Sequence, residues 1–357
     1  MSRTFNFVLI GCGRISKKYC ELLSGKKIKN ARLCAVCDID IKRATKVGEK
    51  YGVPYYSDMY KMLNNHPETD IICILTPSGY HSEHVIKMAV FHKHIIVEKP
   101  MALTLDDADH MIKACDENGI KLFVVKQNRF NIPVKKLREA IDKGRFGKLV
   151  LGTVRVRWCR TQEYYDMDEW RGTWALDGGV LTNQASHHID LLEWMMGDVE
   201  SVFAKSITAL SNIEVEDTAV VTLKFRNGAL GIIEATTATR PKDLEGSISI
   251  LGEKGTVEIG GFAVNKMKIW QFSDLADEEK SVIDKYSCNP PDIYGFGHKE
   301  YIEHVIDCIK NDKKALVDGL EGRKSLELIM AIYESIETGK EVFLRFKPNK
   351  CRLGNKN

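Results

Sequence analysis

The sequence predicts an α/β protein of two lobes: a doubly wound parallel sheet, followed by an α+β domain with an open, mainly antiparallel sheet. Up to residue 125, short apolar runs alternate with amphipathic helical stretches, which is typical of right-handed crossovers and a parallel sheet covered on both faces. Beyond this point, longer runs alternate apolar and polar residues, as half-buried strands do. The chain of 357 residues also exceeds the length of one typical core. We therefore predict one domain at 1–125 and a second at 126–357.

The first lobe divides into strands and helices by its apolar pattern. Apolar runs predict strands at 5–10, 31–37, 71–75, 94–97 and 121–125. The amphipathic stretches between them predict helices at 13–23, 41–50, 81–91 and 105–117. Parallel sheets of this kind bind ligands beyond the carboxyl ends of their strands. Residues that directly follow these strands are therefore the first candidates for a site.

The second lobe begins with a linking helix at 133–143. Strands are predicted at 148–158, 199–209, 219–225, 229–236, 246–251 and 256–259, and helices at 185–196, 298–310 and 320–337. Asn227-Gly228 predicts a tight hairpin turn, and Glu253-Lys254-Gly255 predicts another. An open sheet that helices back on one face has a second face that must be polar or covered by a partner. We therefore expect a homo-oligomer and favour a tetramer.

The composition argues against several classes of partner. The chain is 44% hydrophobic and 28% charged with a net charge of +3, so bulk charge gives no argument for binding nucleic acid or a membrane surface. No apolar run approaches the roughly 20 residues of a membrane helix, and residues 1–7 have no signal-peptide pattern. The ten cysteines follow no regular spacing, so we expect a reducing, cytoplasmic setting. Cys34 and Cys37 could form a redox pair or half a zinc site, but two positions on one buried strand is the favoured interpretation.

The turn after the first strand has the pattern of a dinucleotide-binding, Rossmann-type fold. Gly11 permits a tight turn, Gly13 lets the backbone approach a pyrophosphate, and the helix that follows directs its N–H groups at the phosphates. Asp38 ends the second strand, where its carboxylate can accept hydrogen bonds from ribose hydroxyls and repel a 2′-phosphate. These residues predict NAD and not NADP. Lys42 and Arg43 could serve a 2′-phosphate, but they lie a turn along the next helix.

Two short segments follow later strands of the first lobe, namely Thr76-Pro77 with His81, and Glu98-Lys99-Pro100. Both should lie at the nicotinamide, because the carboxyl ends of the strands share one edge of the sheet. The proline after Lys99 restricts that residue to an extended conformation. A positioned amine is therefore favoured over a lysine in a surface turn.

These segments resemble the family of glucose–fructose oxidoreductase and inositol dehydrogenase. A second-lobe stretch extends the match: Gly178-Gly179-Val180-Leu181-Thr182-Asn183-Gln184-Ala185-Ser186-His187-His188-Ile189-Asp190. In that family the lysine of Glu-Lys-Pro and a histidine three residues before an aspartate lie at the reacting carbon, which implies Lys99 and His187 here. The family often has an aspartate four residues before this histidine, where this chain has Asn183. Because an amide cannot take a proton, Asn183 is expected to hold a substrate hydroxyl.

Residues 157–166 and 170–179 carry a narrower resemblance, to the dehydrogenases that oxidise C3 of UDP-N-acetylglucosaminuronic acid in bacterial surface-polysaccharide (O-antigen type) biosynthesis. It implies NAD as the cofactor, a UDP-sugar as the substrate and a 3-keto sugar as the product. A diphosphate and a uronate carboxylate call for guanidinium groups, and Arg157, Arg160 and Arg171 lie within fifteen residues. Aromatic faces for uracil, sugar or nicotinamide come from Trp158, Tyr164, Tyr165, Trp170 and Trp174. The alternative is an ordinary sheet edge with a tryptophan-rich corner.

Two other patterns in the sequence give weaker evidence for a site. The histidine pairs 81/84, 92/94 and 187/188 assemble no set of three or four ligands, so we expect no metal. The segment 291–298 is either the entry loop of the next helix or a loop that closes over the sugar, with Tyr294 as a contact.

The expected site residues fall into three groups. Lys99 and His187 are catalytic. The cofactor-binding residues are Gly11, Gly13, Arg14, Ile15, Asp38, Thr76, Pro77, His81, Glu98, Lys99, Gln127, Trp170 and Arg171. The substrate-binding residues are Lys99, Arg160, Tyr165, Trp174, Asn183, His187, His188 and Tyr294.

Hydride transfer requires the alcohol carbon to lie against the nicotinamide while the hydroxyl proton is removed. We expect His187 to be the general base and the Lys99 ammonium to bind the same oxygen, although a lysine of lowered pKa could equally be the base. The sequence does not indicate whether NADH is released or reoxidised in place. A keto acid is a candidate co-substrate for its reoxidation. Two other functions fit the sequence less well: oxidation of a free sugar or inositol by a member of the same family, and a non-catalytic NAD-sensing regulator.

Overall fold

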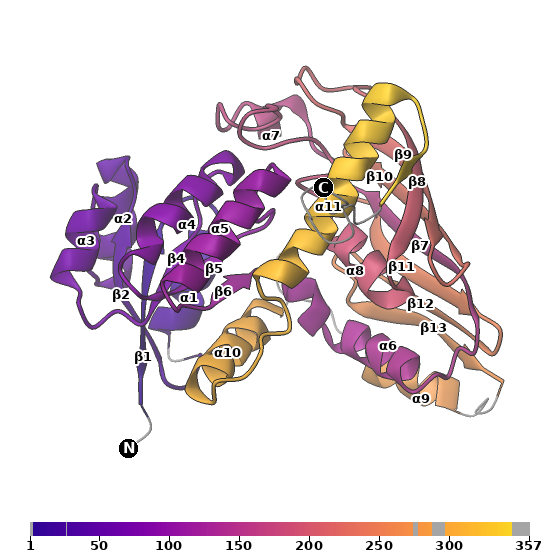
Figure 1. Ribbon diagram of the computed structural model, residues 1–357, viewed down its shortest axis with the longest axis horizontal. Helices are drawn as coiled ribbons and strands as arrows, with labels where there is room; N and C mark the ends of the chain where they lie inside the picture. Colours follow the sequence, from indigo (N-terminus) through magenta and orange to yellow (C-terminus); the bar gives the residue numbers. More distant parts are fainter. Residues whose placement is uncertain (1–2, 26, 274–277, 288–296, 345–357) are drawn as a thin grey trace, which may run out of the picture.

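The computed structural model describes residues 3–25, 27–273, 278–287 and 297–344. Two lobes lie side by side, each built on one sheet, and helix α11 (Gly319–Thr338) runs between them (Figure 1). None of the helices in these ranges combines the length and the apolar character that crossing a membrane requires.

The first lobe is a six-stranded sheet with the strand order β3-β2-β1-β4-β5-β6, and its strand pairs are parallel. The strands are β1 (Phe5–Ile10), β2 (Ala31–Cys37), β3 (Tyr55–Tyr56), β4 (Ile71–Ile74), β5 (His94–Val97) and β6 (Leu122–Val124). The helices are α1 (Ser16–Ser24), α2 (Ile41–Tyr51), α3 (Met59–Asn65), α4 (His81–Ala89) and α5 (Leu105–Glu117). The predicted doubly wound class is confirmed. The strand order reverses between β1 and β4, and such a reversal opens a ligand crevice at the carboxyl ends of the strands.

Two details of this lobe differ from the prediction. Helix α1 begins at Ser16 and not at residue 13, because the chain first turns at Gly11, whose φ of 105° is a conformation that glycine adopts readily. The segment 55–65 forms β3 and α3, which were not predicted. Asp58 caps α3 by accepting hydrogen bonds from two backbone N–H groups, but a two-residue strand is too short to show an apolar period.

The second lobe is an eight-stranded sheet with the order β13-β12-β11-β7-β10-β9-β8-β14. Its strands are β7 (Leu149–Arg157), β8 (Val199–Ile207), β9 (Thr218–Phe225), β10 (Leu230–Thr236), β11 (Glu245–Gly252), β12 (Gly255–Gly260), β13 (Lys266–Phe272) and β14 (Val342–Phe343). The chain beyond residue 125 also forms helices α6 (Ile132–Asp142), α7 (Gln162–Tyr165), α8 (Ser186–Met196), α9 (Glu278–Lys285) and α10 (Gly297–Lys310). The mainly antiparallel class is confirmed, with β7 and β10 as a parallel pair. Elements α7, α9, β13 and β14 were not predicted.

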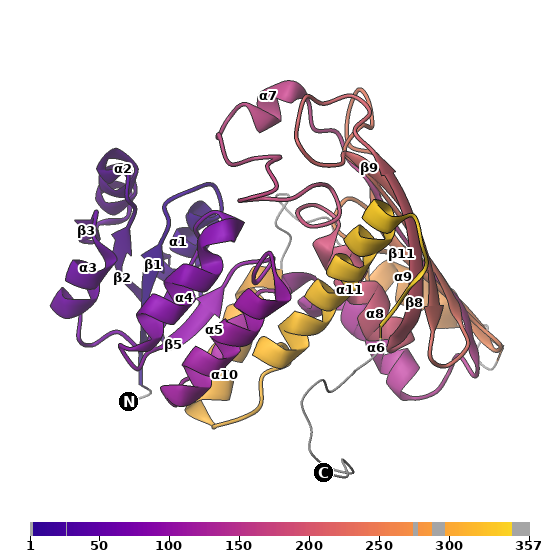
Figure 2. The same ribbon diagram turned by 45° about the horizontal axis from the view of Figure 1, so that its top comes forward.

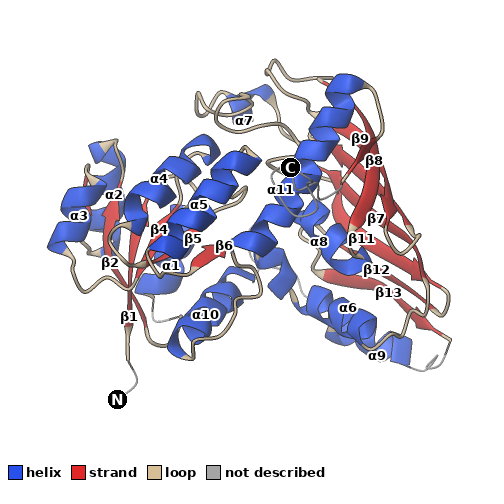
Figure 3. Ribbon diagram, viewed as in Figure 1, coloured by secondary structure: helices blue, strands red, loops and turns tan. Residues whose placement is uncertain are grey.

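Helices cover one face of this sheet. In Figure 3, α8 and α11 lie on the side of the sheet that faces the first lobe. The core between them includes Val154 on β7, Leu192 on α8 and Ile329 on α11. Strands β9 and β10 bury every second residue, so their other residues form an outer face that no helix of the described ranges covers.

Helix α10 crosses the predicted domain boundary. Figures 1 and 2 show it beside the first lobe, although the chain reaches it only after the second-lobe sheet. Its residues Tyr301, Ile302 and Val305 pack in one buried cluster with Phe5 and Tyr19 of the first lobe. The expected division at residue 125 therefore needs a correction for α10, because apolar packing returns this helix to the first lobe.

The Cys34-x-x-Cys37 pattern lies on β2. Both cysteines are buried and free, and burial raises the pKa of both thiols, that of Cys37 to about 12. The interpretation as two positions on one buried strand is confirmed.

Candidate active site

The glycine turn after β1 has room for a dinucleotide. A Cβ at Gly11 would lie 2.7 Å from the backbone of Leu75, so only glycine lets β1 and β4 approach this closely. A Cβ at Gly13 would meet no atom within 4 Å, which leaves open space beside the turn. The Asp38 carboxylate accepts hydrogen bonds from the Cys12 N–H at 2.7 Å and from the Asp40 N–H at 2.9 Å. Asp38 is thus fixed at the end of β2 and keeps lone pairs for ribose hydroxyls, as NAD requires.

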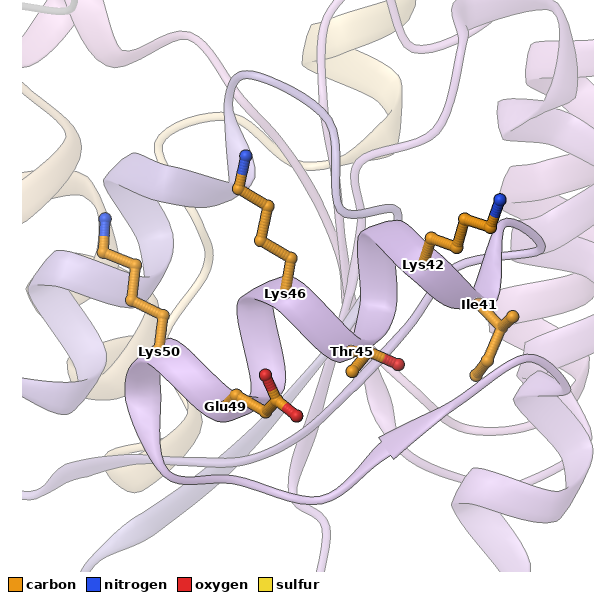
Figure 4. Close-up of a pocket in the computed structure, with 6 residues that line it drawn as sticks. All are labelled: Ile41, Lys42, Thr45, Lys46, Glu49 and Lys50. Atoms are coloured by element: carbon orange, nitrogen blue, oxygen red, sulfur yellow. The ribbon is translucent and has the colours of Figure 1, made fainter.

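The lysines of α2 do not join this turn. Figure 4 shows a surface pocket on α2, lined by Ile41, Lys42, Thr45, Lys46, Glu49 and Lys50. None of these residues belongs to the expected site. Arg43 pairs with Asp40 at 3.5 Å and with Asp168 of the second lobe at 3.4 Å. The basic residues of α2 therefore offer little support for a 2′-phosphate.

His81 and Glu98 support the loops at this edge from inside the protein. The two ring nitrogens of His81 lie 2.8 Å from the carbonyl oxygens of Thr76 and Pro100, so the ring lies between the two loops and donates to both when it is protonated and to one when it is neutral. The Glu98 carboxylate accepts hydrogen bonds from the Tyr19 hydroxyl and the Lys99 N–H, both at 3.1 Å. The side chains of both residues are buried and have internal partners, and their assignment to cofactor binding stays a prediction.

Lys99 reaches from the end of β5 to the second lobe. Its Nζ donates hydrogen bonds to the backbone oxygen of Asn183 at 2.8 Å and to the side-chain oxygen of Asn183 at 3.2 Å. Burial lowers the pKa of Lys99, while the carboxylates of Glu98 and Asp177 act in the opposite direction. The amine is thus held at the junction of the lobes, beside the carboxyl ends of the first-lobe strands.

His187 lies in the first turn of α8 at the same junction. Its Nε2 is 3.0 Å from the Gln127 amide nitrogen, while its Nδ1 has no hydrogen-bond partner among the described residues. Burial holds the pKa of His187 well below its ordinary value, and the positive charges of Lys99 and Lys126 lower it further. The imidazole is therefore neutral near pH 7, and with the Gln127 NH₂ group donating to Nε2 its ring proton lies on Nδ1. Buried polar atoms without partners at this point are what a polar ligand would satisfy.

Helix α8 is anchored by a buried charge cluster. Arg129 donates two hydrogen bonds to the Asp190 carboxylate, both at 2.8 Å, and a third to Glu321 on α11 at 3.0 Å. Lys126 lies 3.8 Å from Asp190 and donates a hydrogen bond to Ser325 at 2.8 Å. The position of His187 at the start of α8 thus depends on ion pairs that join three segments.

Replacing Asp190 by Ala should therefore destabilise the protein strongly. Two buried cations would lose the carboxylate that they share, which leaves Arg129 with Glu321 alone, and breaking such a buried pair costs about 3–5 kcal/mol. Asp142→Ala, which removes an exposed ion pair with Arg138, is the matched control and should cost less than about 1 kcal/mol. Chemical denaturation measures both variants, and equal unfolding free energies for the two would contradict the anchoring role.

Three guanidinium groups surround Tyr164, at the start of the loop that follows β7. Arg14 of the glycine turn lies 5.9 Å from the centre of the Tyr164 ring, Arg160 lies 5.4 Å away and Arg171 lies 4.6 Å away. Figures 1 and 2 show helix α7 of this loop reaching from the second lobe toward the first. Arg171 also donates to the Tyr164 hydroxyl and to Asp168. The arrangement brings cations from both lobes to one place and suits an anionic ligand.

Other expected residues lie elsewhere. Arg157 forms ion pairs with Glu234 at 2.6 Å and Glu245 at 3.1 Å, so its charge is used within the sheet. The Tyr165 hydroxyl bonds to Thr237 in the interior, and His188 is fully buried beside Trp158. The Tyr165 hydroxyl thus has an internal partner, whereas neither ring nitrogen of His188 has one among the described residues; the assignment of both residues to the substrate stays a prediction.

Three other expected residues and the expectation on metals remain. Trp174 is half exposed and packs against Tyr333 of α11. Arg160 is also paired with Asp243 at 3.0 Å. Tyr294 lies outside the described residues. No group of three or more His, Cys, Asp or Glu side chains suited to a metal ion occurs in the described ranges.

Sequence reasoning missed Asp177 and Lys126. Asp177 accepts a hydrogen bond from the Asn183 side chain at 2.6 Å, and Lys126 lies close enough to lower the pKa of His187. A glycine-rich context surrounds Asp177 in the chain, and no spacing rule connects it to Lys99. Only the folded arrangement brings them together.

The first domain is doubly wound and has an open glycine turn, and the second domain places an imidazole beside a lysine of the first. Together they define the class of two-domain, dinucleotide-dependent oxidoreductases. The chain belongs to the oxidoreductase family named after glucose–fructose oxidoreductase, inositol dehydrogenase and MocA. The family's NAD-binding Rossmann-fold model matches residues 5–126, and its C-terminal alpha/beta-domain model matches residues 138–344. The protein is therefore an NAD-dependent oxidoreductase.

Individual proteins of known structure or activity are similar to this chain. The WlbA dehydrogenase from Chromobacterium violaceum, solved in complex with NADH and UDP-GlcNAcA, is 42% identical, with a TM-score of 0.90 and 98% of each chain covered. The WlbA dehydrogenase from Bordetella pertussis, also in complex with NADH and UDP-GlcNAcA, is 42% identical with a TM-score of 0.87, over 97% of this chain and 100% of the other. Myo-inositol 2-dehydrogenase from Thermotoga maritima is 31% identical over 343 residues, 94% of this chain and 97% of that protein.

Proposed function

We propose that this protein oxidises the C3 hydroxyl of UDP-N-acetylglucosaminuronic acid to a 3-keto sugar with NAD, in surface-polysaccharide biosynthesis of the O-antigen type. The observation that carries the proposal is the meeting of Lys99, Asn183 and His187 at the lobe junction, beside a cluster of three guanidinium groups. The 42% identity to two dehydrogenases solved with this UDP-sugar supports the same substrate. The free, buried cysteines of the described chain fit the cytoplasmic setting that we expect.

The catalytic roles follow from charge and position. Bound NAD supplies the hydride acceptor. His187 is neutral and takes the proton of the reacting hydroxyl at Nδ1. This requires the Gln127 amide to be turned so that its oxygen, which has no hydrogen-bond partner among the described residues, accepts from Nε2–H. Lys99, kept charged by nearby carboxylates, uses the N–H that Asn183 does not occupy to stabilise the developing alkoxide. Asn183 itself is already bonded to Lys99 and Asp177, so it orients Lys99 in addition to any contact with the sugar.

The arginine cluster provides the selection for an anionic sugar. Arg160 and Arg171 would meet the diphosphate or the uronate carboxylate, and Arg14 would meet the pyrophosphate of the cofactor. An uncharged polyol such as inositol has no negative charge for these guanidinium groups to bind. This favours a nucleotide-linked uronate over the free-sugar and inositol alternatives.

The proposal is tested by mixing the purified protein with NAD and UDP-N-acetylglucosaminuronic acid and following absorbance at the NADH band. We expect NADH formation and a product that has lost two hydrogens by mass spectrometry. UDP-N-acetylglucosamine, which lacks the carboxylate, and myo-inositol are the controls. A keto acid added in a parallel reaction without free NAD tests whether bound cofactor is recycled, because product would then exceed the amount of cofactor bound to the enzyme. NADH formation with inositol but not with the UDP-uronate would contradict the proposal.

Replacing Arg160 by Gln should raise KM for the UDP-uronate about 10- to 150-fold, because a charge-assisted hydrogen bond contributes about 1.5–3 kcal/mol. The matched control is Arg157→Gln, whose charge is already used by Glu234 and Glu245. Initial rates at varied substrate measure both. A KM that changes equally in the two variants would mean that Arg160 has no special contact with the substrate.

The outer face of the second-lobe sheet supports a homo-oligomer, and we propose a tetramer that uses this face in one of its contacts. Phe203 and Ile232 both lie opposite Thr222, so they form one row across β8, β9 and β10. Exposed apolar residues continue along the face at Val220 and Leu230, which are 53% and 56% exposed. An exposed row of apolar side chains on a sheet is typical of contacts between copies.

Ile232→Glu should therefore lower the molar mass in solution, because it would bury a charge without a partner at the contact. Light scattering after size exclusion measures the mass of the wild type and the variant. Lys205→Glu, a charge exchange at the same face, is the control for surface charge alone. A wild-type protein that runs as a monomer would contradict the proposal.

A further inference from the structure

The carboxylate of Asp177 lies behind Asn183, where the roles proposed above do not use it. Only 1% of the surface of Asp177 is exposed. Its Oδ2 accepts a hydrogen bond from the Gly172 N–H at 2.9 Å, and its Oδ1 accepts one from the Asn183 side-chain nitrogen at 2.6 Å. Both donors are uncharged, although burying an ionised carboxylate without a directly bonded cation is costly. Holding a loop together does not require a charge, so the carboxylate calls for another role.

The orientation of the Asn183 amide depends on this carboxylate. The two ends of an amide have nearly the same shape, and their partners decide which end donates. An ionised carboxylate can only accept, so Asp177 requires the NH₂ end of Asn183 and turns its oxygen toward Lys99. The Lys99 Nζ then has two acceptors on Asn183, at 2.8 and 3.2 Å. An ammonium has three N–H groups, so one remains for a ligand.

We propose that Asp177 is a positioning residue, which fixes the Asn183 amide so that Lys99 is aimed at the reacting oxygen and is kept as an ammonium. This inference rests on the role proposed for Lys99. The chain thereby keeps a negative charge close to Lys99 although Asn183 itself carries none. The network runs from the loop after β7, through the residue before α8, to the end of β5.

The charge of Asp177 should be visible in the pH dependence. The ionisable groups that face it are Lys99 after β5 and Arg171 and Tyr165 in the loop after β7. Burial raises the pKa of Asp177 to about 6, against the lowering effects of the Gly172 N–H and of the charges on Lys99 and Arg171. The carboxylate is therefore ionised above about pH 6 and protonated below it. Because the protonated form no longer requires the NH₂ end of Asn183, turnover should fall as the pH drops through this value.

The test exchanges the carboxylate and the amide. In Asp177→Asn, one oxygen would have to accept from both Gly172 and Asn183, so the Asn183 amide loses its fixed orientation. We expect kcat for the UDP-uronate to fall about 100-fold, with unchanged NAD affinity and no acid limb near pH 6. In the double variant Asp177→Asn/Asn183→Asp, the new amide can accept from Gly172 and donate to the new carboxylate, which lies beside Lys99. This variant should recover kcat to within about tenfold of the wild type.

The outcomes separate this inference from the proposed function. If Asp177 only held its loop, the single variant would lose thermal stability but keep its kcat and its acid limb, and that result would overturn the inference while the function stands. If the single variant does not fold, the double variant decides, and a kcat about 100-fold below wild type would count against the positioning role.

The chemical reactivity of Lys99 can be measured without substrate. This measurement tests the inference even if the wild-type protein does not oxidise the UDP-uronate. Competitive acetylation of Lys99 by acetic anhydride, quantified by peptide mass spectrometry, reports the fraction of neutral amine. Loss of the nearby charge in Asp177→Asn should lower the pKa of Lys99 and raise its labelling at pH 8 by about threefold, which corresponds to half a pKa unit. Equal labelling of wild type and variant would refute the positioning role independently of any activity.

Discussion

Lys99→Met is expected to lower kcat for UDP-uronate oxidation by about 1,000-fold, while the affinity for NAD changes little. Methionine fills a space similar to that of the lysine stem, so the half-buried position stays packed. The variant removes the N–H donor to the developing alkoxide, and donors of this kind are worth about 100- to 1,000-fold in rate. Stopped-flow or steady-state NADH absorbance measures kcat, and quenching of protein fluorescence measures NAD binding.

The matched control for Lys99→Met is Lys87→Met. Lys87 is an exposed lysine of α4 that pairs with Glu83 on the same helix. It should keep the wild-type rate. A Lys99→Met variant that retained most of its turnover would refute the assignment of Lys99 to the reaction.

His187→Ala is expected to lower kcat by about 100- to 1,000-fold, within the range typical of a lost general base. The imidazole is buried between the lobes, so its removal leaves a space of the same shape. Free imidazole added to the assay should enter that space and restore part of the rate in proportion to its concentration. Lys99 remains in the variant, so the residual rate measures what alkoxide stabilisation supplies alone.

His110→Ala provides the control for this second variant. His110 is an exposed histidine on α5 and should show neither a loss of rate nor a response to imidazole. If His187→Ala kept its rate, or if imidazole rescued nothing, Lys99 would become the better candidate for the base.

Much of the fold follows from the sequence because buried strands are continuous apolar runs. The strands at 5–10 and 31–37 have the bounds of β1 and β2. The elements that escaped prediction are short or mixed in polarity. Strand β3 has two residues, and β13 alternates buried and exposed positions without a marked turn on both sides.

Long-range packing could not be predicted. The parallel pairing of β7 and β10 joins strands that lie far apart in the chain, and α10 returns to the first lobe across the whole second-lobe sheet. Neither feature leaves a local pattern. The spacing of apolar residues in α10 indicates that one face of this helix is buried. It does not indicate which part of the protein that face packs against.

The site residues in local motifs could likewise be predicted, whereas the contacts between distant segments could not. Gly11, Gly13 and Asp38 lie in one local motif, and Lys99 and His187 each belong to a short segment with a family resemblance. The contacts that link these segments come from residues distant in the chain, such as Arg14 with Tyr164 and Lys99 with Asn183. Conversely, His188 shares a motif with His187, but the helix turns its side chain into the core.

The central claim is that an amine of the first lobe and an imidazole of the second act on one hydroxyl. A crystal structure of the inactive Lys99→Met variant and one of the wild type, each with NAD and UDP-N-acetylglucosaminuronic acid, would test it directly. We predict that the C3 oxygen lies about 3 Å from a ring nitrogen of His187 in both crystals, and equally close to Lys99 Nζ in the wild type. A sugar bound with this oxygen facing away from either nitrogen would contradict the mechanism.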